Sequence, residues 1–422
     1  MMNILEEIQN CPVEWRELGE ISHFYGGLTG KTKSDFENGN AKYVTYKNIF
    51  NNLQVELNLL ETVRVDENEK QNSINYGDVL ITGSSESKEE VGMSSVVTFI
   101  PDEPIYLNSF SFGIRFNEDV ELLPEFTKYL FRSFRLRKQI EKTASGVTRY
   151  NVSKVTFKKI KVPLLPLEIQ EKIVQILDKM TEYVTELTSE LTSRKKQYSF
   201  YRDKLLSFED EVYQVEWKTL GDIGKVSMCK RILKNQTSDD GEIPFYKIGT
   251  FGKVATSFIS RELFEEYKLR FSYPKLGDIL ISASGTIGRT VVFNGEDSYF
   301  QDSNIVWLEH DESQVLNRYL YYFYQMNPWK VSDGGTISRL YNGNIEKTTI
   351  PVPSLEIQSR IVQVLDNFDM VCNDLNIGLP KEIELRQKQY EYFREKLLTF
   401  VAEGEYTDRT VQYSTDKTSL GS

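Results

Sequence analysis

The residue types that most often perform catalysis are sparse and scattered in this chain. His23 and His310 are the only histidines, and neither has neighbouring metal ligands. The three cysteines, Cys11, Cys229 and Cys372, form no CxxC pair, so we expect neither a disulfide framework nor a zinc site. No cluster of carboxylates with a lysine has the spacing of a nuclease site. The sequence therefore predicts no catalytic residue and no bound metal in this chain.

Two short motifs approach catalytic signatures, but each lacks an essential residue. YGGLTGKT has Tyr25 where a phosphate-binding loop requires its first glycine. NPW (327–329) lacks the second proline of the (N/D)PP(Y/F/W) motif with which amino-methyltransferases hold a base, and no glycine-rich cofactor loop accompanies it. The first absence counts against an NTPase, and the second, together with the missing carboxylate cluster, counts against a fused methyltransferase or nuclease. A methyl-transfer assay on the purified chain would test that alternative.

Two loops carry side chains suited to contacting DNA. SGVTRYNVSK (145–154) and GGTISRLYNGN combine a flexible glycine, hydroxyls, an arginine and an asparagine. Hydroxyl, amide and guanidinium groups are the donors that meet phosphates and base edges. The alternative is that each loop is a structural turn before the following strand. The candidate contacts in these loops are Arg149, Asn151, Lys154, Arg339 and Asn342.

Further candidates lie where lysines and arginines alternate with aromatic residues. They occur in KTK (31–33) and YVTYKN (43–48), and at comparable places in MCKRILKNQT (228–237) and GEIPFYKIGTFG. Strand packing is the alternative explanation of the aromatic residues. The candidate DNA contacts in these segments are Lys31, Lys33, Tyr46, Lys47, Lys230, Arg231, Lys234, Tyr246 and Lys247.

The overall charge appears unfavourable for a nucleic-acid partner, because the formal net charge is −11 over 422 residues. One basic stretch, 128–161, contains a single acid, Glu141, and is either a DNA-facing patch or a solvated helix face. The acidic start MMNILEEIQN and the lack of a long apolar run predict a soluble, cytoplasmic protein without a membrane partner.

The chain repeats itself with a period near 200 residues, which indicates duplication of a whole module. EWRELGEI (14–21) returns as EWKTLGDI (216–223), and YGDVLIT (76–82) returns as LGDILIS (276–282). VPLLPLEIQEKIVQILDK (162–179) and RKKQYSFYRDKLLSF (194–208) also recur, at 350–367 and 386–400. Each copy therefore contains a globular stretch followed by a helical one.

Short apolar runs bounded by Gly and Asn predict strands of a mixed α+β domain in each globular stretch. Helices are expected at 124–142 and 315–327. The predicted divisions are a first globular domain at 1–165, a helical segment at 166–211, a second globular domain at 212–353, a second helical segment at 354–402 and a disordered tail at 403–422.

Each helical stretch carries an apolar stripe at a mean spacing of about 3.6 residues, which predicts two nearly straight helices that pair with each other. A homodimeric zipper is the alternative. Leu379 precedes a proline, so we expect a break there. The predicted pairing and partner-interface residues are Ile169, Ile173, Leu187, Arg194, Tyr198, Ile357, Ile361, Arg386 and Tyr390, and the stripes also include Ile176, Val364, Val371 and Leu375.

The repeat of a globular unit followed by a helix that opens with P-L/S-L-E-I-Q resembles the specificity (S) subunit of Type I restriction-modification systems. GEIPFYKIG, GDILIS, SGTIG (284–288) and QDSNIV add to this resemblance, which covers residues 10–402. It implies two α+β DNA-recognition domains separated by two long antiparallel helices, in a pseudo-two-fold arrangement. It also implies a non-catalytic subunit that reads a bipartite target in double-stranded DNA.

The resemblance further implies partners that hold the cofactors. Two modification subunits would use S-adenosylmethionine to methylate adenine at N6, and two motor-nuclease restriction subunits would use ATP and Mg. No cofactor is expected on this chain. A scaffold with two ligand-binding domains remains the competing interpretation, and failure to co-purify with a methyltransferase encoded beside it would favour that scaffold.

Overall fold

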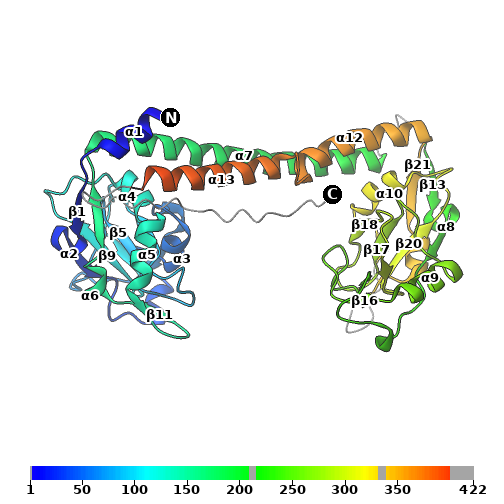
Figure 1. The fold of residues 1–422 in the computed structure, drawn as a ribbon, viewed down its shortest axis with the longest axis horizontal. Coiled ribbons are helices and arrows are strands. Elements are labelled where there is room, and N and C mark those ends of the chain that lie inside the picture. Colours follow the sequence, from blue (N-terminus) through cyan, green and yellow to red (C-terminus); the bar gives the residue numbers. More distant parts are fainter. Residues whose placement is uncertain (1, 209–214, 331–338, 400–422) are drawn as a thin grey trace. The chain divides into compact units, whose positions relative to one another are not determined.

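The computed structural model describes residues 2–208, 215–330 and 339–399. The chain divides into two compact units, residues 1–186 with 384–422, and residues 187–383. Each unit contains one globular domain, which we call head 1 (14–164) or head 2 (216–352), and parts of the long helices (Figure 1). The predicted tail at 403–422 lies outside the described residues, as do residues 334–338 of the second candidate loop.

Head 1 contains short strands and helices, and a separate helix α1 (Met2–Asn10) precedes it. The helices of head 1 are α2 (Leu18–Ile21), α3 (Tyr46–Asn51), α4 (Pro124–Leu130), α5 (Phe134–Lys142) and α6 (Lys154–Phe157), with short 3-10 helices at Lys33–Phe36 and Leu57–Leu59. Its strands are β1 (Glu14–Glu17), β2 (Ser22–Gly26), β3 (Ala41–Val44), β4 (Glu61–Val63), β5 (Val79–Thr82), β6 (Ser84–Ser85), β7 (Ser94–Val96), β8 (Ile105–Leu107), β9 (Ser111–Phe116), β10 (Ala144–Ser145), β11 (Tyr150–Val152) and β12 (Lys161–Leu164).

Head 2 is built from a similar but not identical set of elements. Its helices are α8 (Leu220–Ile223), α9 (Arg261–Arg270), α10 (Asn317–Tyr324) and α11 (Asn342–Glu346), with a 3-10 helix at Lys234–Gln236. Its strands are β13 (Glu216–Thr219), β14 (Lys225–Ser227), β15 (Ile243–Tyr246), β16 (Phe258–Ile259), β17 (Ile279–Ser282), β18 (Thr290–Val292), β19 (Tyr299–Phe300), β20 (Ile305–Glu309) and β21 (Thr349–Val352).

The sheets of the two heads share one topology. The four-stranded order β2-β9-β5-β7 of head 1 corresponds to β14-β20-β17-β18 of head 2. The three-stranded sheet β4-β3-β8 of head 1 corresponds in the same way to β16-β15-β19 of head 2. Each of these sheets combines one antiparallel and one parallel pair of strands. The duplication seen in the sequence is therefore a duplication of fold.

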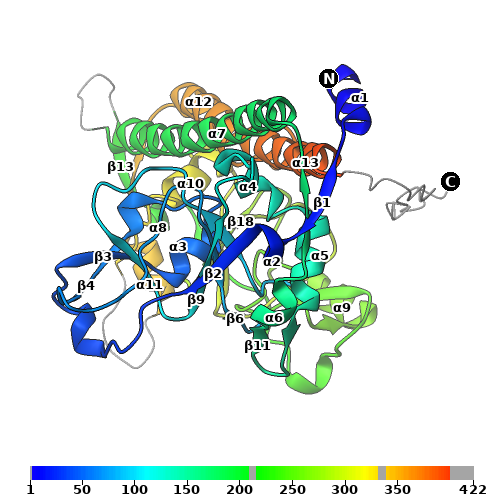
Figure 2. The same cartoon turned by 90° about the vertical axis from the view of Figure 1, so that its left-hand side faces the viewer.

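The chain enters and leaves each head on paired strands. In head 1, β1 runs antiparallel to β12, with Trp15 opposite Pro163. In head 2, β13 pairs with β21 in the same way, with Trp217 opposite Pro351. We call each of these two-stranded ladders a neck. Since a neck joins the two ends of a head, the strands within that head form a closed structural module (Figure 2).

One small sheet is described in full only in head 1. Head 1 contains the three-stranded order β10-β11-β6. Head 2 has a single described bridge, Ser284 to Arg339, at the corresponding place, next to the residues that the structure does not describe.

A large apolar core joins each head to the helix that follows it. In unit 1 this core includes Phe112, Phe126 and Phe157 of head 1 together with Ile173 and Leu177 of α7. In unit 2 the core includes Trp329, Tyr319 and Ile281 of head 2, and Ile361 and Leu365 of α12. Burial of side chains this large stabilises a core by roughly 1.5–3 kcal/mol each. The head and the start of its helix therefore fold as one body.

The long helices are α7 (Leu167–Ser207, 41 residues), α12 (Leu355–Asn373) and α13 (Leu379–Leu397). The predicted break in the second helical stretch is present, but the expectation that Leu379 itself leaves the helix is wrong. The chain interrupts the helix at 374–378, and Leu379 is the first residue of α13. Pro380 therefore stands in the first turn of a new helix, where its missing N–H removes no helical hydrogen bond.

The helices run antiparallel within each unit. In unit 1, Arg386 of α13 lies over the ring of Tyr183, and Tyr390 and Leu397 pack with earlier residues of α7. In unit 2, the ring of Tyr201 stacks on that of Phe368 at 5.7 Å. The fold class predicted from the sequence is confirmed, with two mixed α+β domains, an internal repeat and long paired helices. None of the helices in the described part of the chain combines the length and hydropathy that a bilayer crossing requires.

Part of the predicted stripe was wrong. Val364, Val371 and Leu375 are 42, 39 and 72% exposed, although the spacing placed them in the interface. Leu365 and Cys372, one position further along, are fully buried instead. The core of unit 2 approaches α12 from the side of head 2 as well as from α7, which rotates the buried face away from the simple periodic stripe.

Candidate DNA-binding surfaces

A β-hairpin carries the candidate loop of head 1. The hairpin comprises β10, a turn at 146–149 and β11, with Ser145 opposite Asn151. Its turn requires glycine, because Gly146 has a φ of +145° and a Cβ there would lie 2.0 Å from the carbonyl oxygen of Arg149. Val147 at the tip is 92% exposed. The sequence therefore builds a projecting finger rather than a loop packed on the head.

Three predicted contact residues of head 1 meet around Ser84. The Nε of Arg149 donates to the Ser84 hydroxyl at 3.0 Å, and the Tyr46 hydroxyl donates to the Ser84 carbonyl at 2.8 Å. Asn151 pairs with Ser84 through the β11–β6 ladder. Among the described residues, the terminal nitrogens of Arg149 have no hydrogen-bond partner. This arrangement orients a guanidinium towards solvent and leaves its fork available to an external acceptor.

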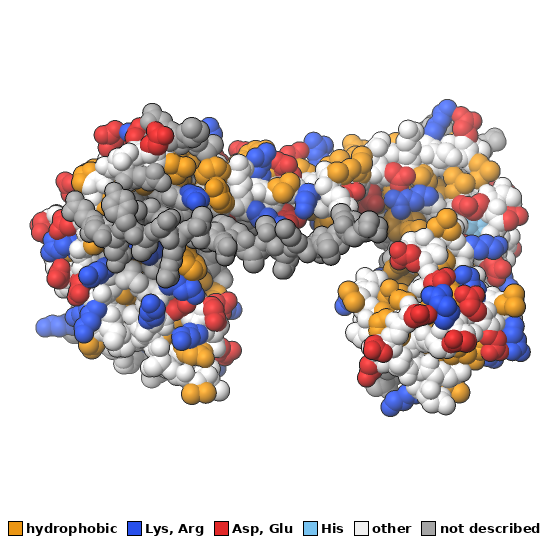
Figure 3. Space-filling model, in the orientation of Figure 1, with side chains coloured by type: hydrophobic (Ala, Val, Ile, Leu, Met, Phe, Trp, Pro, Cys, Tyr) orange, Lys and Arg blue, Asp and Glu red, His pale blue; other side chains and the backbone are white. Residues whose placement is uncertain are grey.

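The finger lies at the end of head 1 opposite to α7 and α13, as the β11 and α6 labels show in both views (Figures 1 and 2). On the face of this unit drawn in Figure 3, lysine and arginine side chains lie among acidic ones rather than in one continuous patch. Specific donors on the finger are therefore better placed than bulk charge to account for recognition by this surface.

Arg339 of head 2 occupies a different environment. Its Nη2 donates to the carbonyl and hydroxyl oxygens of Ser303, both at 3.2 Å, and lies 3.4 Å from Asn304 Oδ1. Ser284 also donates to Asn304 Oδ1, at 2.7 Å. The ladder places Arg339 opposite Ser284 and Asn151 opposite Ser84, so Arg339 corresponds in position to Asn151 and not to Arg149.

The segments YVTYKN and GEIPFYKIGTFG occupy comparable places, but their tyrosine-lysine pairs do not coincide in register. Strand β3 ends at Val44, whereas the corresponding strand β15 ends at Tyr246. Tyr46 and Lys47 therefore begin helix α3, two residues beyond the position that Tyr246 occupies. The shared tyrosine-lysine pair is a coincidence of sequence that the strand register reveals.

The remaining predicted lysines and arginines differ in how freely they could meet DNA. Lys31 has a side chain only 5% exposed and forms an ion pair with Glu69, and Arg231 pairs with Asp302 at 3.0 Å. Lys247 donates to the Ser257 hydroxyl at 2.7 Å, while Lys33, Lys47 and Lys234 are exposed. The Nζ of Lys154 lies 5.2 Å from the centroid of the Phe112 ring, and that of Lys230 lies 5.2 Å from the centroid of the Phe271 ring. Both lysines are exposed, and Asn342 begins α11.

The basic stretch at 128–161 is neither a continuous DNA-facing patch nor a solvated helix face at Lys128, Arg132 and Arg137. Arg132 donates to the carbonyls of Ser94 and Ile49, and Arg137 donates to that of Gly92. Burial lowers the pKa of Arg132 to about 10. That value is still well above 7, so the guanidinium is charged at neutral pH. Lys128 is buried and pairs with Asp178. These cations hold loops of head 1 together.

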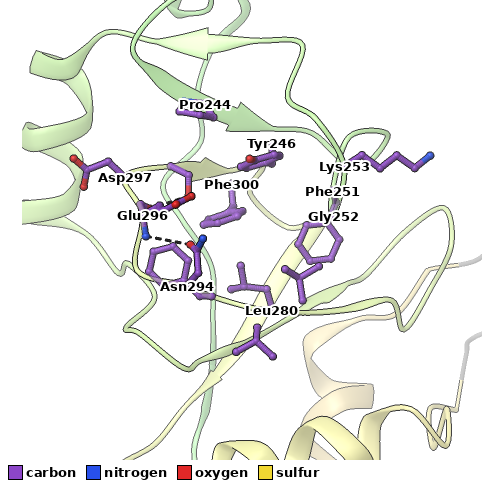
Figure 4. Close-up of a pocket in the computed structure, with 14 residues that line it drawn as sticks. Pro244, Tyr246, Phe251, Gly252, Lys253, Leu280, Asn294, Glu296, Asp297 and Phe300 are labelled. Atoms are coloured by element: carbon purple, nitrogen blue, oxygen red, sulfur yellow. Dashed lines mark hydrogen bonds between the residues drawn. The ribbon is translucent and has the colours of Figure 1, made fainter. Parts of the chain in front are cut away.

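A cavity of about 170 Å³ lies beside Tyr246 in head 2 (Figure 4). The rings of Tyr246 and Phe300 are stacked at 5.7 Å, and Phe251 and Leu280 complete an apolar wall. Tyr246 is therefore part of the aromatic packing of head 2. Among the described residues, no group of three or more His, Cys, Asp or Glu side chains could hold a metal ion, and the three cysteines are free thiols.

Sequence reasoning missed two buried glutamines that join heads to helices. Gln170 and Gln358 are both fully buried, and both belong to the repeated LEIQ segment. The sequence did contain a signal, because both LEIQ segments have a glutamine at the same position among apolar residues. A glutamine that faced only solvent would not need to be repeated.

The predicted pairing residues lie as follows. Ile173, Leu187, Tyr198 and Ile361 are buried, and the Tyr198 hydroxyl donates to Gln325 at 2.7 Å. Arg194 is exposed and pairs with Glu190 on its own helix. The other four are Ile169, which is buried, and Ile357, Arg386 and Tyr390, which are partly buried.

A groove of about 730 Å³ runs along the helical part of unit 1. Ile176, Met180 and Tyr183 of α7 supply its apolar lining, and Arg386 and Gln389 of α13 supply polar groups. The groove is an accessible surface on the helices, separate from the finger of head 1.

Two stretches of the chain, residues 12–194 and 214–385, match the family model of the Type I restriction modification DNA specificity domain. The chain belongs to this family. The resemblance inferred from the repeated motifs is thereby confirmed, and the protein is a sequence-specific DNA-recognition component that is not itself catalytic.

Curated relatives bear the same description. The chain is 53% identical over 264 residues to a type I restriction enzyme specificity subunit of Haemophilus influenzae, covering 61% of this chain and 68% of the relative. It is 35% identical over 267 residues to the EcoR124I/EcoR124II specificity subunit of Escherichia coli, covering 59% of this chain and 65% of the relative. The matched stretches thus span about two thirds of these relatives.

Solved structures share the fold. One matching chain comes from a structural study of complex assembly and conformational transition in the type I R-M system. Its TM-score is 0.60 at 18% identity, and the match covers 92% of this chain and 98% of that one. The HsdS subunit from Thermoanaerobacter tengcongensis has a TM-score of 0.50 at 18% identity, covering 92% and 95%.

Proposed function

We propose that each head reads one half of a bipartite, asymmetric DNA target and that the paired helices set the length of the unspecified gap. One observation carries this proposal. The heads share one sheet topology, but the corresponding positions Asn151 and Arg339 differ in residue and in surroundings. Two different half-sites require different side chains at the reading surfaces, because bases are distinguished by their patterns of donors and acceptors. The shared sheet topology can hold those different side chains in equivalent places.

We further propose that the chain directs two modification subunits and two restriction subunits to that target. The modification subunits supply S-adenosylmethionine and methylate adenine at N6, and the restriction subunits supply ATP and Mg. The groove between α7 and α13 supports a docking role for the helices, because it offers apolar side chains such as Ile176 and Met180 beside Arg386.

The formal net charge of −11 supports the dependence on partners. Phosphate neutralisation requires basic side chains near the duplex. Several candidates on this chain are already paired, including Lys31 with Glu69 and Arg231 with Asp302. In this proposal the modification subunits supply most of the phosphate contacts, so DNA recognition is measured on the assembled complex.

Exchange of a whole head tests the proposal. Residues 14–164 are replaced by head 1 of another specificity subunit, with both neck strands included so that the β1–β12 ladder is retained. We expect one half-site to change while the other half-site and the gap stay the same, because each head has its own core. Mapping of N6-methyladenine in DNA modified by the assembled complex gives the readout.

A matched control uses the chain's own head 2 in the place of head 1. If the heads read independently, this chimera methylates a target whose two halves are identical and inverted. A change in both halves of the first chimera, or an asymmetric target for the control, would show that the heads do not read independently.

A further inference from the structure

We infer that each head is fixed to its helix at two repeated points, and that Gln170 with Asp178, and Gln358 with Asp366, are positioning residues that set the gap length. This inference rests on the proposed function and concerns the joint rather than the reading surface. It assigns a role to side chains that bond each head to its own long helix.

The first point of the joint in unit 1 is the amide of Gln170. Its Oε1 accepts from the backbone N–H of Leu123 at 2.9 Å, and its Nε2 donates to the carbonyls of Glu121 at 2.9 Å and Leu165 at 2.7 Å. Leu123 is the residue before α4, and Leu165 lies between β12 and α7. One buried side chain thus ties the helix, the neck and the head together.

Unit 2 repeats this arrangement bond for bond. The Oε1 of Gln358 accepts from the N–H of Leu316 at 2.9 Å, and its Nε2 donates to the carbonyls of Gln314 at 2.8 Å and Pro353 at 2.9 Å. Leu316 is the residue before α10, as Leu123 is before α4. The same three bonds in two heads with different surfaces indicate a constraint on placement.

The second point lies eight residues further along each helix. In unit 1, Asp178 accepts from the Tyr129 hydroxyl at 2.6 Å and from Lys128 Nζ at 2.8 Å. Burial, reinforced by the bond to Asp178, raises the pKa of Tyr129, so its hydroxyl remains a donor. Both donors stand on α4, the helix whose start Gln170 holds.

The equivalent carboxylate of unit 2 is Asp366. It accepts a hydrogen bond from the Tyr322 hydroxyl and a second from Arg318 Nε, the latter at 2.6 Å. Both donors lie on α10. Eight residues of helix span about 12 Å. Together with the apolar core that each head shares with its helix, two attachments at that separation restrain the angle between a head helix and its long helix more strongly than one attachment would.

The angle matters because the finger of head 1 lies at the far end of the head from α7 (Figure 1). A rotation at the joint moves the far end most. Since neighbouring base pairs are about 3.4 Å apart, a loosened joint lets the head accept sites shifted by one base pair. The half-site bases stay the same, because the reading surface is untouched.

The test measures gap preference on the complex with the modification subunits. The substrate is a plasmid library that carries the two half-sites separated by gaps of varying length, and methylation at each gap is counted. Gln170→Met and Gln358→Met keep the side-chain length but remove the amide. Each is expected to lower the preference for the native gap over gaps one base pair longer or shorter by about tenfold, as loss of net buried hydrogen bonding predicts.

Two milder variants guard against failure to fold. Tyr129→Phe and Tyr322→Phe remove one hydroxyl each and are expected to lower gap preference by about threefold. Gln363→Met, at an exposed glutamine of α12, is the control and should keep the native gap. Equal loss of methylation at every gap length in the four joint variants would overturn the inference, since that result indicates a folding role alone.

The same library separates this inference from the proposed function. A wild-type complex that methylates no bipartite sequence refutes the function. A wild-type complex with a sharp gap preference, together with joint variants that keep it unchanged, refutes only the role of the joint.

Discussion

Arg149 is held by one bond and presents the rest of its guanidinium outward. The Nε bond to Ser84 fixes the plane of the group at the base of the finger. An oriented guanidinium can donate to O6 and N7 of guanine together, in a more fixed geometry than a flexible ammonium. At the scale of single residues, we therefore propose Arg149 as a base-contacting donor of head 1.

Replacement of Arg149 by alanine should weaken DNA binding by the assembled complex by about 1–3 kcal/mol, if the side chain contacts a base. The loss should concentrate at one base pair, which a titration against single-base variants of the target will reveal. Arg16→Ala is the control, because Arg16 is an exposed arginine that pairs with Glu14 and Glu20 at the neck. Unchanged affinity of the Arg149 variant would assign that residue to the turn.

At the residue scale, the sequence indicated chemical types but not exposure. The segment SGVTRYNVSK forms a hairpin whose turn is defined locally by Gly146, and its contact with DNA stays a prediction. Arg132 and Arg137 lie in the segment expected to be helical, and the sequence did not indicate that their guanidinium groups are largely buried. Which cations reach solvent depends on loops that lie distant in sequence, such as the segment around Ser94.

At the scale of elements, the interruption between α12 and α13 distinguishes the second helical stretch from the continuous α7. Gly378 sits where backbone carbonyls crowd, since a Cβ there would lie 2.5 Å from Met370 O and 2.6 Å from Asp374 O. Those carbonyls belong to the end of α12 and the connection, so they cannot move without opening that helix end.

Gly378→Ala should therefore lower the free energy of unfolding by about 1–3 kcal/mol. Denaturant unfolding of the full chain measures this. Gly343→Ala is the matched control in helix α11, because a Cβ at Gly343 meets nothing within 4 Å and alanine favours the helix. Equal stability of the two variants would mean that the close approach at Gly378 does not hold the connection.

The helices themselves were the most predictable elements. An apolar period sustained over four or more turns identifies a helix whatever it packs against. The buried face was less predictable, because Leu365 and Cys372 are buried while Val364 is not. The repetition of the joint glutamines in both LEIQ segments was a signal, but their role escaped prediction because backbone partners such as Leu123 lie far away in the sequence.

At the scale of the whole molecule, α7 is the continuous connection between the two duplicated modules, and its first and second halves belong to different units. If the helices set the gap, adding one turn to α7 should lengthen it. One turn adds about 5.4 Å, which corresponds to between about one and two base pairs.

We expect four helix-forming residues inserted after Ser189 to lengthen the methylated gap by about one or two base pairs, with the half-sites unchanged. The same four residues inserted between Asp102 and Glu103, in an exposed loop of head 1, form the control and should leave the gap as it was. Methylation mapping of both variants gives the answer. Altered half-site bases in the α7 variant would count against a spacer role.

The neck also has a consequence for how such proteins change over generations. Each head begins and ends on adjacent strands, β1 with β12 and β13 with β21, and near-identical coding segments such as EW and LEIQ flank both. Genetic crossover within those segments exchanges a complete reader in frame. Such an exchange leaves the joint glutamine and the helix behind it intact, so a lineage acquires a new recognition sequence in one recombination event without redesigning the rest of the protein.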